Sequence, residues 1–269
     1  MTWIRALVLI GFVALPVSAF SSEYGKPTWE VGFGVAPISF PEYRGSSRQR
    51  HYVLPMPYLI YRGDFLRVDR EGIRGLLLET RNVDIDLSID GTVPVASDDD
   101  GLRQGMPDLD PVFEVGPSVN WTLLDGDTLD LQFKWPVRSV FATDFRQISH
   151  VGWTTHPHIH MSPTRGVGGW NFSVSSGPLW ADSRYHGYYY SVPQEFATAT
   201  RPGYEAQAGY SGWMSRMALS RRFERFWVGA FLRYDNMQGA EFGDSPLVDS
   251  THSLMVGAGV AWILAGHAQ

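Results

Sequence analysis

The most regular feature of this sequence is an alternation of apolar and polar residues with a period of two. It is clearest at residues 128–138, where mostly polar residues separate five apolar ones: Leu129, Leu131, Phe133, Trp135 and Val137. Successive side chains of a β-strand point to opposite faces of the sheet. The segment therefore predicts a strand with one apolar face and one polar face.

The same alternation recurs along most of the chain. It is found at residues 29–35, 83–90, 113–121, 170–175, 226–234 and 254–262. Turn sequences that contain glycine, such as 62–64 and 125–127, separate neighbouring segments. The spacing predicts about twelve strands, within a range of roughly 10–14, the first near residues 28–37 and the last near 252–264. No helical periodicity is evident after residue 19.

The N-terminus has the pattern of a secretory signal peptide. Arg5 precedes an apolar stretch over residues 6–15, and Val17-Ser18-Ala19 resembles a small-residue cleavage site. The apolar stretch is too short to span a bilayer as a helix. We therefore expect an exported protein with a cleaved signal peptide at 1–19 and a single domain at 20–269.

Export and many alternating strands together predict an all-β fold, a closed antiparallel transmembrane β-barrel in the outer membrane of a Gram-negative bacterium. In such a barrel the apolar faces meet lipid and the polar faces line the lumen. The sheet must close, because an open edge leaves backbone groups unpaired in hydrocarbon. Aromatic residues make up 14% of the chain, with 10 Trp and 12 Tyr, and these residues suit the two membrane–water interfaces.

A soluble β-sandwich or lipocalin-like barrel, with apolar faces turned inward, is the alternative fold. Two features favour the membrane. The polar face at Glu30, Gly32 and Gly34 combines charge with small size, which fits a lumen better than a solvated surface. The chain also has more alternating segments than the ~8 strands of a lipocalin need.

Charge and motifs exclude several classes of function. The formal net charge is −6, so we expect no nucleic-acid partner, which would need a basic face. Neither a G-x-S-x-G nucleophile turn nor an H-E-x-x-H zinc motif occurs in the sequence. We predict a non-enzymatic protein with no catalytic residue, cofactor or metal.

Two polar clusters have a metal-binding alternative. His156, His158 and His160 share one face of a predicted strand, so two of them are near enough to share an ion, or all three simply line the lumen. Asp98, Asp99 and Asp100 suit calcium in residue type but lack EF-hand spacing, which favours a solvated acidic loop.

The early part of the chain is rich in arginine. The residues are Arg44, Arg48, Arg50, Arg62, Arg67, Arg70 and Arg74. They fit contacts with lipopolysaccharide phosphates, or ion pairs in the lumen with carboxylates such as Asp84, Asp86, Asp90 and Glu114. The second interpretation is favoured, because charges inside a lumen need partners.

Several stretches resemble the MipA/OmpV family of outer-membrane proteins, named after the MltA-interacting protein. They are 40–47 (FPEYRGSS), 55–75 (PMPYLIYRGDFLRVDREGIRG), 103–118 (RQGMPDLDPVFEVGPS), 135–140 (WPVRSV), 177–192 (GPLWADSRYHGYYYSV) and 244–248 (DSPLV). The resemblance implies an outer-membrane barrel. It also implies a scaffold that links a murein-cleaving lytic transglycosylase to a murein synthase. The alternative is a small-solute or toxin channel, or another permeability or adhesion protein, in contact with outer-membrane lipid and lipopolysaccharide.

One segment stands out as a candidate partner contact. Residues 103–111 combine apolar and charged side chains with stiff glycine and proline positions, which indicates docking to a partner or folding back into the lumen. The candidate contact residues are Arg103, Met106, Asp108, Leu109 and Asp110. If the N-terminus is periplasmic and the strand near 82–95 is the fourth, residues 92–110 face the murein layer.

Overall fold

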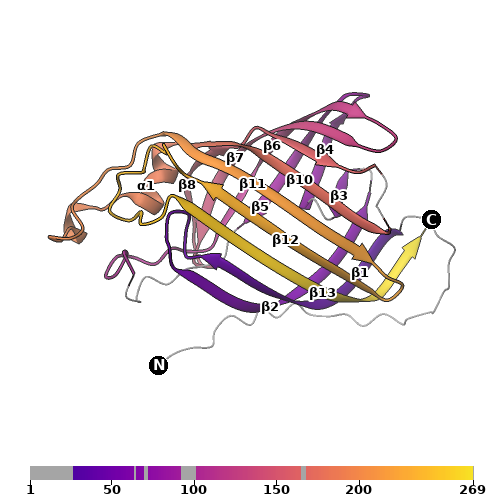
Figure 1. Cartoon of the computed structure of the whole chain (residues 1–269), viewed down its shortest axis with the longest axis horizontal. Helices are drawn as coiled ribbons and strands as arrows, with labels where there is room; N and C mark the ends of the chain where they lie inside the picture. Colours follow the sequence, from indigo (N-terminus) through magenta and orange to yellow (C-terminus); the bar gives the residue numbers. More distant parts are fainter. Residues whose placement is uncertain (1–26, 64, 70–71, 92–100, 165–167, 269) are drawn as a thin grey trace.

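The computed structural model describes residues 27–63, 65–69, 72–91, 101–164 and 168–268. The predicted signal peptide at 1–19 and the acidic cluster Asp98 to Asp100 lie outside the described residues. The described chain forms a cylinder of tilted strands, with loops and a short helix gathered at one end (Figure 1).

Nearly every element is an antiparallel strand. The strands are β1 (Pro27–Pro41), β2 (Gln49–Arg62), β3 (Leu66–Asp69), β4 (Gly72–Glu79), β5 (Val83–Gly91), β6 (Val112–Asp125), β7 (Asp130–Thr143), β8 (Ile148–Thr155), β9 (His158–Ser162), β10 (Trp170–Ala181), β11 (Gly209–Arg222), β12 (Phe226–Asn236) and β13 (His252–Ala268). Two short helices, α1 (Ser183–Tyr190) and the 3-10 turn η1 (Gln194–Phe196), lie between β10 and β11.

The strands close into a ring in sequence order. Each pairs with the next, except that β8 and β9 do not pair with each other, and β13 returns to pair with β1 along most of its length, from Pro27↔Ala268 to Ser39↔Val256. β8 and β9 occupy a single place between β7 and β10, interrupted at His156 and Pro157. The barrel therefore has 12 strand positions, which confirms the predicted closed antiparallel barrel.

The alternation of the sequence translates directly into two surfaces. Trp135 on β7 and Trp262 on β13 are 50% and 55% exposed on the outer wall, although both are large and apolar. The intervening residues point inward, where Glu30, Asn120 and Asp235 are buried. An apolar outside and a polar inside are what a lipid-embedded barrel requires.

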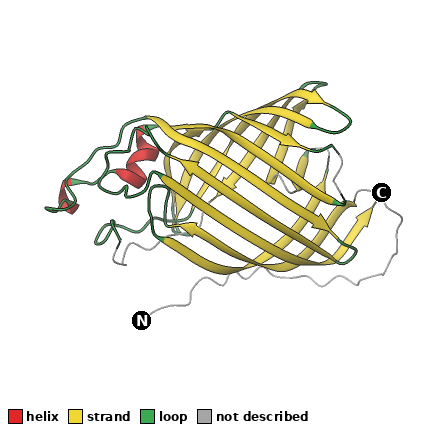
Figure 2. Cartoon of the chain, in the orientation of Figure 1, coloured by secondary structure: helices red, strands yellow, loops and turns green. Residues whose placement is uncertain are grey.

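The two ends of the barrel differ. At the end that carries Pro27 and Ala268, neighbouring strands are joined by short turns, such as those at 80–82, 126–129 and 223–225. The connections at 42–48, 182–208 and 237–251 extend from the opposite end, and Figure 2 shows the helices there. In transmembrane barrels short turns face the periplasm and longer loops face outward.

Two expectations are corrected. The strand at Val83–Gly91 is the fifth, because residues 63–79 form two short strands, so the described residues 101–111 lie at the end opposite the termini. Helix α1 was not predicted, because eight residues with a run of three tyrosines give no readable helical period. No helix in the described part of the chain has the length and apolar character of a membrane-spanning helix.

Candidate functional site: a capped lumen

The loops opposite the termini pack into a small core of their own. We call the described residues 42–48, 101–111, 182–208 and 237–251 the cap. All four connections supply buried apolar side chains to one cluster: Tyr43, Leu109, Tyr190, Ala206, Met237, Ala240 and Phe242. Tyr190 stacks on Phe242 with ring centroids 3.7 Å apart. Because the cluster joins segments that are distant in sequence, the cap is held as one unit across the mouth of the barrel.

Arg44 links the cap to the barrel wall. Its guanidinium donates to Asp235 Oδ1 at 2.9 Å and to the carbonyl of Ser211 at 2.7 Å. The hydroxyl of Tyr190 donates in turn to the carbonyl oxygen of Arg44 at 2.9 Å. The two bonds donated by the Arg44 guanidinium are charge-assisted, and such bonds are roughly twice as strong as neutral ones. They fix the first loop of the cap against β11 and β12.

His186 is fully buried at the centre of the cap. Its Nδ1 lies 2.6 Å from the carbonyl oxygen of Gln207, which can only accept, so Nδ1 carries the proton. Nε2 is then the acceptor for the hydroxyl of Ser211 at 3.0 Å. Burial lowers the pKa of His186, because a charged imidazolium loses its hydration there.

The candidate contact segment folds back onto the cap. Arg103 donates to the carbonyl of Tyr189 at 3.0 Å and is buried, and burial lowers the pKa of its guanidinium. Met106 packs with Val192 and Leu247. Leu109 belongs to the apolar cluster already described, so three of the five candidate residues are buried inside this chain.

Asp108 and Asp110 lie at the surface of that segment. Asp108 is exposed, and Asp110 is half-buried. The backbone N–H of Asp110 donates to the hydroxyl of Tyr188 at 2.8 Å, and burial raises the pKa of that hydroxyl to about 12. The segment packs into the cap and not into the lumen, although Leu109 and Asp110 reach the cavity beneath it. Contact with a partner stays a prediction for its exposed residues.

A glycine allows helix α1 to pack closely against the barrel wall. Gly152 on β8 has φ 132°, and a Cβ atom there would overlap Asp182 and Tyr185. The carboxylate of Asp182 caps the helix by accepting from the N–H of Tyr185 at 2.9 Å. This N-cap starts the helix at the wall, and the chain then turns across the lumen.

Beneath the cap lies a cavity of about 580 Å³. Its upper wall is aromatic and apolar, with Phe40, Tyr43, Leu109, Tyr185, Tyr189 and Tyr190. Its sides carry charged groups from five strands: Asp90, Glu114, Arg138, Arg216, Arg233 and Asp235. Binding cavities are typically of this size, mostly apolar, with a few convergent polar groups.

Ion pairs cross the lumen at the level of this cavity. Arg216 on β11 donates to Asp90 on β5 at 3.0 Å, although the two strands are not neighbours in the ring. Arg138 on β7 lies 3.6 Å from the same carboxylate and 3.7 Å from Glu114. The side chains of Arg216 and Asp90 stay 40% and 34% exposed, so this pair is accessible from the lumen.

The histidine row lines the lumen. The rings of His156 and His158 stack with centroids 4.5 Å apart, and both rings bond to backbone carbonyl oxygens, those of Gly177 and His156. Within the described ranges, no group of three or more His, Cys, Asp or Glu side chains is arranged to hold a metal ion.

Four of the early arginines form ion pairs within the described chain, but with carboxylates other than those named as available, and Arg44 pairs with Asp235. Arg48 and Arg50 lie 3.6 and 2.7 Å from Glu42, and Arg67 lies 3.4 Å from Glu79. Asp90 and Glu114 instead meet arginines of later strands. The sequence shows which face a charge lies on, and closure of the ring decides its partner.

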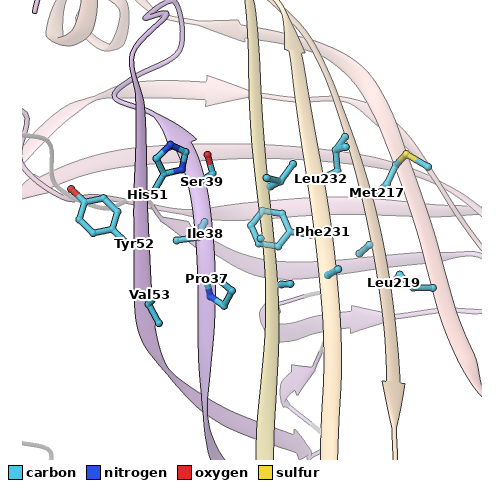
Figure 3. Close-up of a pocket in the computed structure, with 15 residues that line it drawn as sticks. Pro37, Ile38, Ser39, His51, Tyr52, Val53, Met217, Leu219, Phe231 and Leu232 are labelled. Atoms are coloured by element: carbon cyan, nitrogen blue, oxygen red, sulfur yellow. The ribbon is translucent and has the colours of Figure 1, made fainter.

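A second hollow, of about 750 Å³, lies on the outer wall (Figure 3). It crosses β11, β12, β13, β1 and β2, and small side chains at Ala230 and Ala258 create it between larger neighbours such as Leu219 and Val53. Most of its side chains are apolar, as expected of a surface that faces lipid.

The closed ring, the apolar outer wall and the polar lumen define an outer-membrane β-barrel protein. Residues 33–264 match the family described as MltA-interacting protein MipA, and the chain belongs to that family. This confirms the resemblance found in the sequence.

Other comparisons are distant. The chain is similar to the NanC porin at 7% identity, over 87% of this chain and 98% of that one, with a TM-score of 0.37. It is similar to OprG from Pseudomonas aeruginosa at 8% identity, over 90% and 95%, with a TM-score of 0.22. Comparison with curated proteins finds no match. The barrel assignment therefore rests on the strand pairing itself.

Proposed function

We propose that this protein is a non-enzymatic scaffold of the outer membrane that holds a lytic transglycosylase close to a murein synthase. The observation that carries the proposal is the match to the MltA-interacting protein family along nearly the whole barrel. A rigid barrel with a packed cap suits a scaffold, because binding then costs little ordering of the protein.

The murein enzymes would meet the end of short turns. With the termini periplasmic, the turns at 80–82, 126–129 and 223–225 face the murein layer. Their exposed charged residues include Arg81, Glu224 and Arg225. In this orientation a contact through Asp108 or Asp110 is with a partner outside the cell that offers positive or hydrogen-bond-donor groups to the two carboxylates.

Affinity capture from solubilised envelopes tests the scaffold. We expect the tagged barrel to recover a lytic transglycosylase and a murein synthase, and the double variant Arg81→Glu, Arg225→Glu to recover less of both. Arg146→Glu, an equally exposed change at the capped end, is the matched control. Recovery of neither enzyme by the unaltered protein would defeat the proposal.

A small-solute channel is the second candidate, favoured by the charged cavity in the lumen. It predicts ion conductance in planar bilayers that rises when the cap is loosened. A barrel that stays silent with an intact cap and with a disrupted one would exclude it. The non-enzymatic assignment is tested by offering the purified barrel phospholipid and murein, and turnover of either would overturn it.

A further inference from the structure

The charged groups on the strand wall of the lumen cavity balance. Three guanidinium groups of the strands line it, from Arg138, Arg216 and Arg233, against three carboxylates. The carboxylates are those of Asp90, Glu114 and Asp235. Two further lining acids belong to the cap: Glu42, which is matched by Arg48 and Arg50, and Asp110, which lies near the surface. Arg44 also belongs to the cap and pairs with Asp235 at 2.9 Å, so the sign of a ligand depends on which ion pair of the described lining can open.

Each carboxylate of the wall already has partners within the chain. Asp235 accepts from both Arg44 and Arg233, at 2.9 and 2.8 Å. Glu114 accepts from Thr154 at 3.2 Å and lies near Arg138. A cationic solute would have to compete with these guanidinium groups for every carboxylate. The wall therefore disfavours a positive ligand.

Arg216 is the guanidinium that can change its partner. Its bond to Asp90 is accessible from the lumen, and Asp90 keeps Arg138 at 3.6 Å and the N–H of Gly91 at 2.9 Å if Arg216 turns away. No carboxylate is left without a partner by that exchange, so the large cost of an unpaired charge is avoided. Arg216 is free to bind an incoming anion through its planar fork of donors.

The aromatic and apolar part of the cavity wall indicates what the uncharged part of the ligand is. The aromatic rings of Tyr185, Tyr189 and Phe40 line the cavity, together with Leu179 and Met255. Side chains of this kind gain free energy by covering apolar surface. We propose that the cavity is a binding site for a small organic acid, one carboxylate on an aromatic or apolar body, with Arg216 as the residue that binds the carboxylate.

A matched set of probes tests the ligand class in the purified full-length barrel. The probes are phenylacetate, its uncharged amide phenylacetamide, the phenethylammonium cation and acetate, and affinity is measured by calorimetry at pH 7.5. We expect phenylacetate to bind at least about tenfold more tightly than each of the others, which corresponds to one charge-assisted hydrogen bond. Equal affinity for phenylacetate and phenylacetamide would overturn the proposal.

Variants locate the site. Arg216→Gln is expected to abolish the preference for phenylacetate over phenylacetamide, and Arg216→Lys to keep part of it. The matched control is Arg222→Gln, since Arg222 is a lumen arginine of the same strand that pairs with Glu30 at 2.6 Å, away from the cavity. Loss of the preference in Arg222→Gln as well, or its survival in Arg216→Gln, would contradict the assignment. If circular dichroism shows that Arg216→Gln does not fold, Arg216→Lys and the probe series test whether Arg216 binds the carboxylate.

Discussion

The phenol ring of Tyr190 lies flat on the phenyl ring of Phe242, with ring planes within 8° of each other. Tyr190 ends helix α1, and Phe242 belongs to the connection between β12 and β13. Both side chains are almost completely buried. This stack therefore ties two separate loops of the cap together, and it is the contact through which the integrity of the cap is best tested.

Removing one ring of this stack should open the cap and leave the barrel closed. We expect Phe242→Ala to cost the cap about 3–5 kcal/mol, the usual loss for a buried phenylalanine. Hydrogen exchange at the amides of residues 185–190 should accelerate accordingly, while exchange in β1 and β13 should not change. Phe145→Ala is the control, because Phe145 is 77% exposed and its removal creates no cavity. Unchanged exchange in Phe242→Ala would show that the cap does not depend on the stack.

The cap should loosen in acid through His186. Its folded-state pKa lies below the unfolded value of about 6.5, so protonation favours the opened cap. The stabilisation is complete above about pH 6.5 and is lost as the pH falls from there toward the lowered folded-state pKa. The charged groups near the ring are Arg44, Asp182 and Glu241, and Arg44 adds to the cost of a second positive charge.

Limited proteolysis at pH 7.5 and pH 5.5 measures this pH dependence. We expect cleavage within residues 182–208 to increase at the lower pH. In His186→Gln, which carries no charge at either pH, the difference should largely disappear. An equal increase in that variant would assign the pH dependence to another group.

A side chain at Gly152 should undock helix α1. The positive φ and the closeness of Asp182 and Tyr185 leave no room for a Cβ atom. We expect Gly152→Val to expose the cap to protease while the barrel retains its strand signal in circular dichroism. Gly187→Ala is the matched control, since its Cβ would meet only Ser191 Oγ at 3.5 Å, and alanine stabilises a helix by about 0.5–1 kcal/mol. Equal resistance of both variants to protease would refute this role of Gly152.

A charged residue placed on the outer wall should destabilise the folded protein in a bilayer. Val119 lies near the middle of β6 and is 41% exposed on that wall. We expect Val119→Arg to reduce the free energy of folding into lipid bilayers by about 2–4 kcal/mol if the site is near the bilayer midplane. Val119→Leu, which keeps the apolar surface, should be close to neutral. Equal folding of both variants, or a folded and monodisperse protein in detergent-free buffer, would place this wall in water.

Much of the barrel could be predicted from the sequence, because the alternation that decides which face a side chain lies on is a local property. The alternation around Trp135 and Trp262 places both residues outside, as observed. The exception is the region 63–79, where Leu76, Leu77 and Leu78 are consecutive and hide the alternation of β4. The sequence prediction counted one strand too few in this region. That error reversed the predicted side of residues 101–111.

The site could not be predicted in the same way, because its contacts join distant parts of the chain. The sequence places Asp90 and Arg216 on polar faces, but their pairing depends on how many strands close the ring. Arg103, Met106 and Leu109 were recognisable as unusual for a loop. Their burial against Tyr189, Val192 and the aromatic cluster depends on loops that approach one another only after the barrel forms.

The pairing of β1 with β13 constrains how the protein is made. A nascent chain that leaves the ribosome carries β1 long before its partner exists, since that partner is β13, the 17-residue strand at His252–Ala268. Any product truncated before β13 would carry two unsatisfied sheet margins into the envelope. Closure of the ring must therefore wait until β13 has been made.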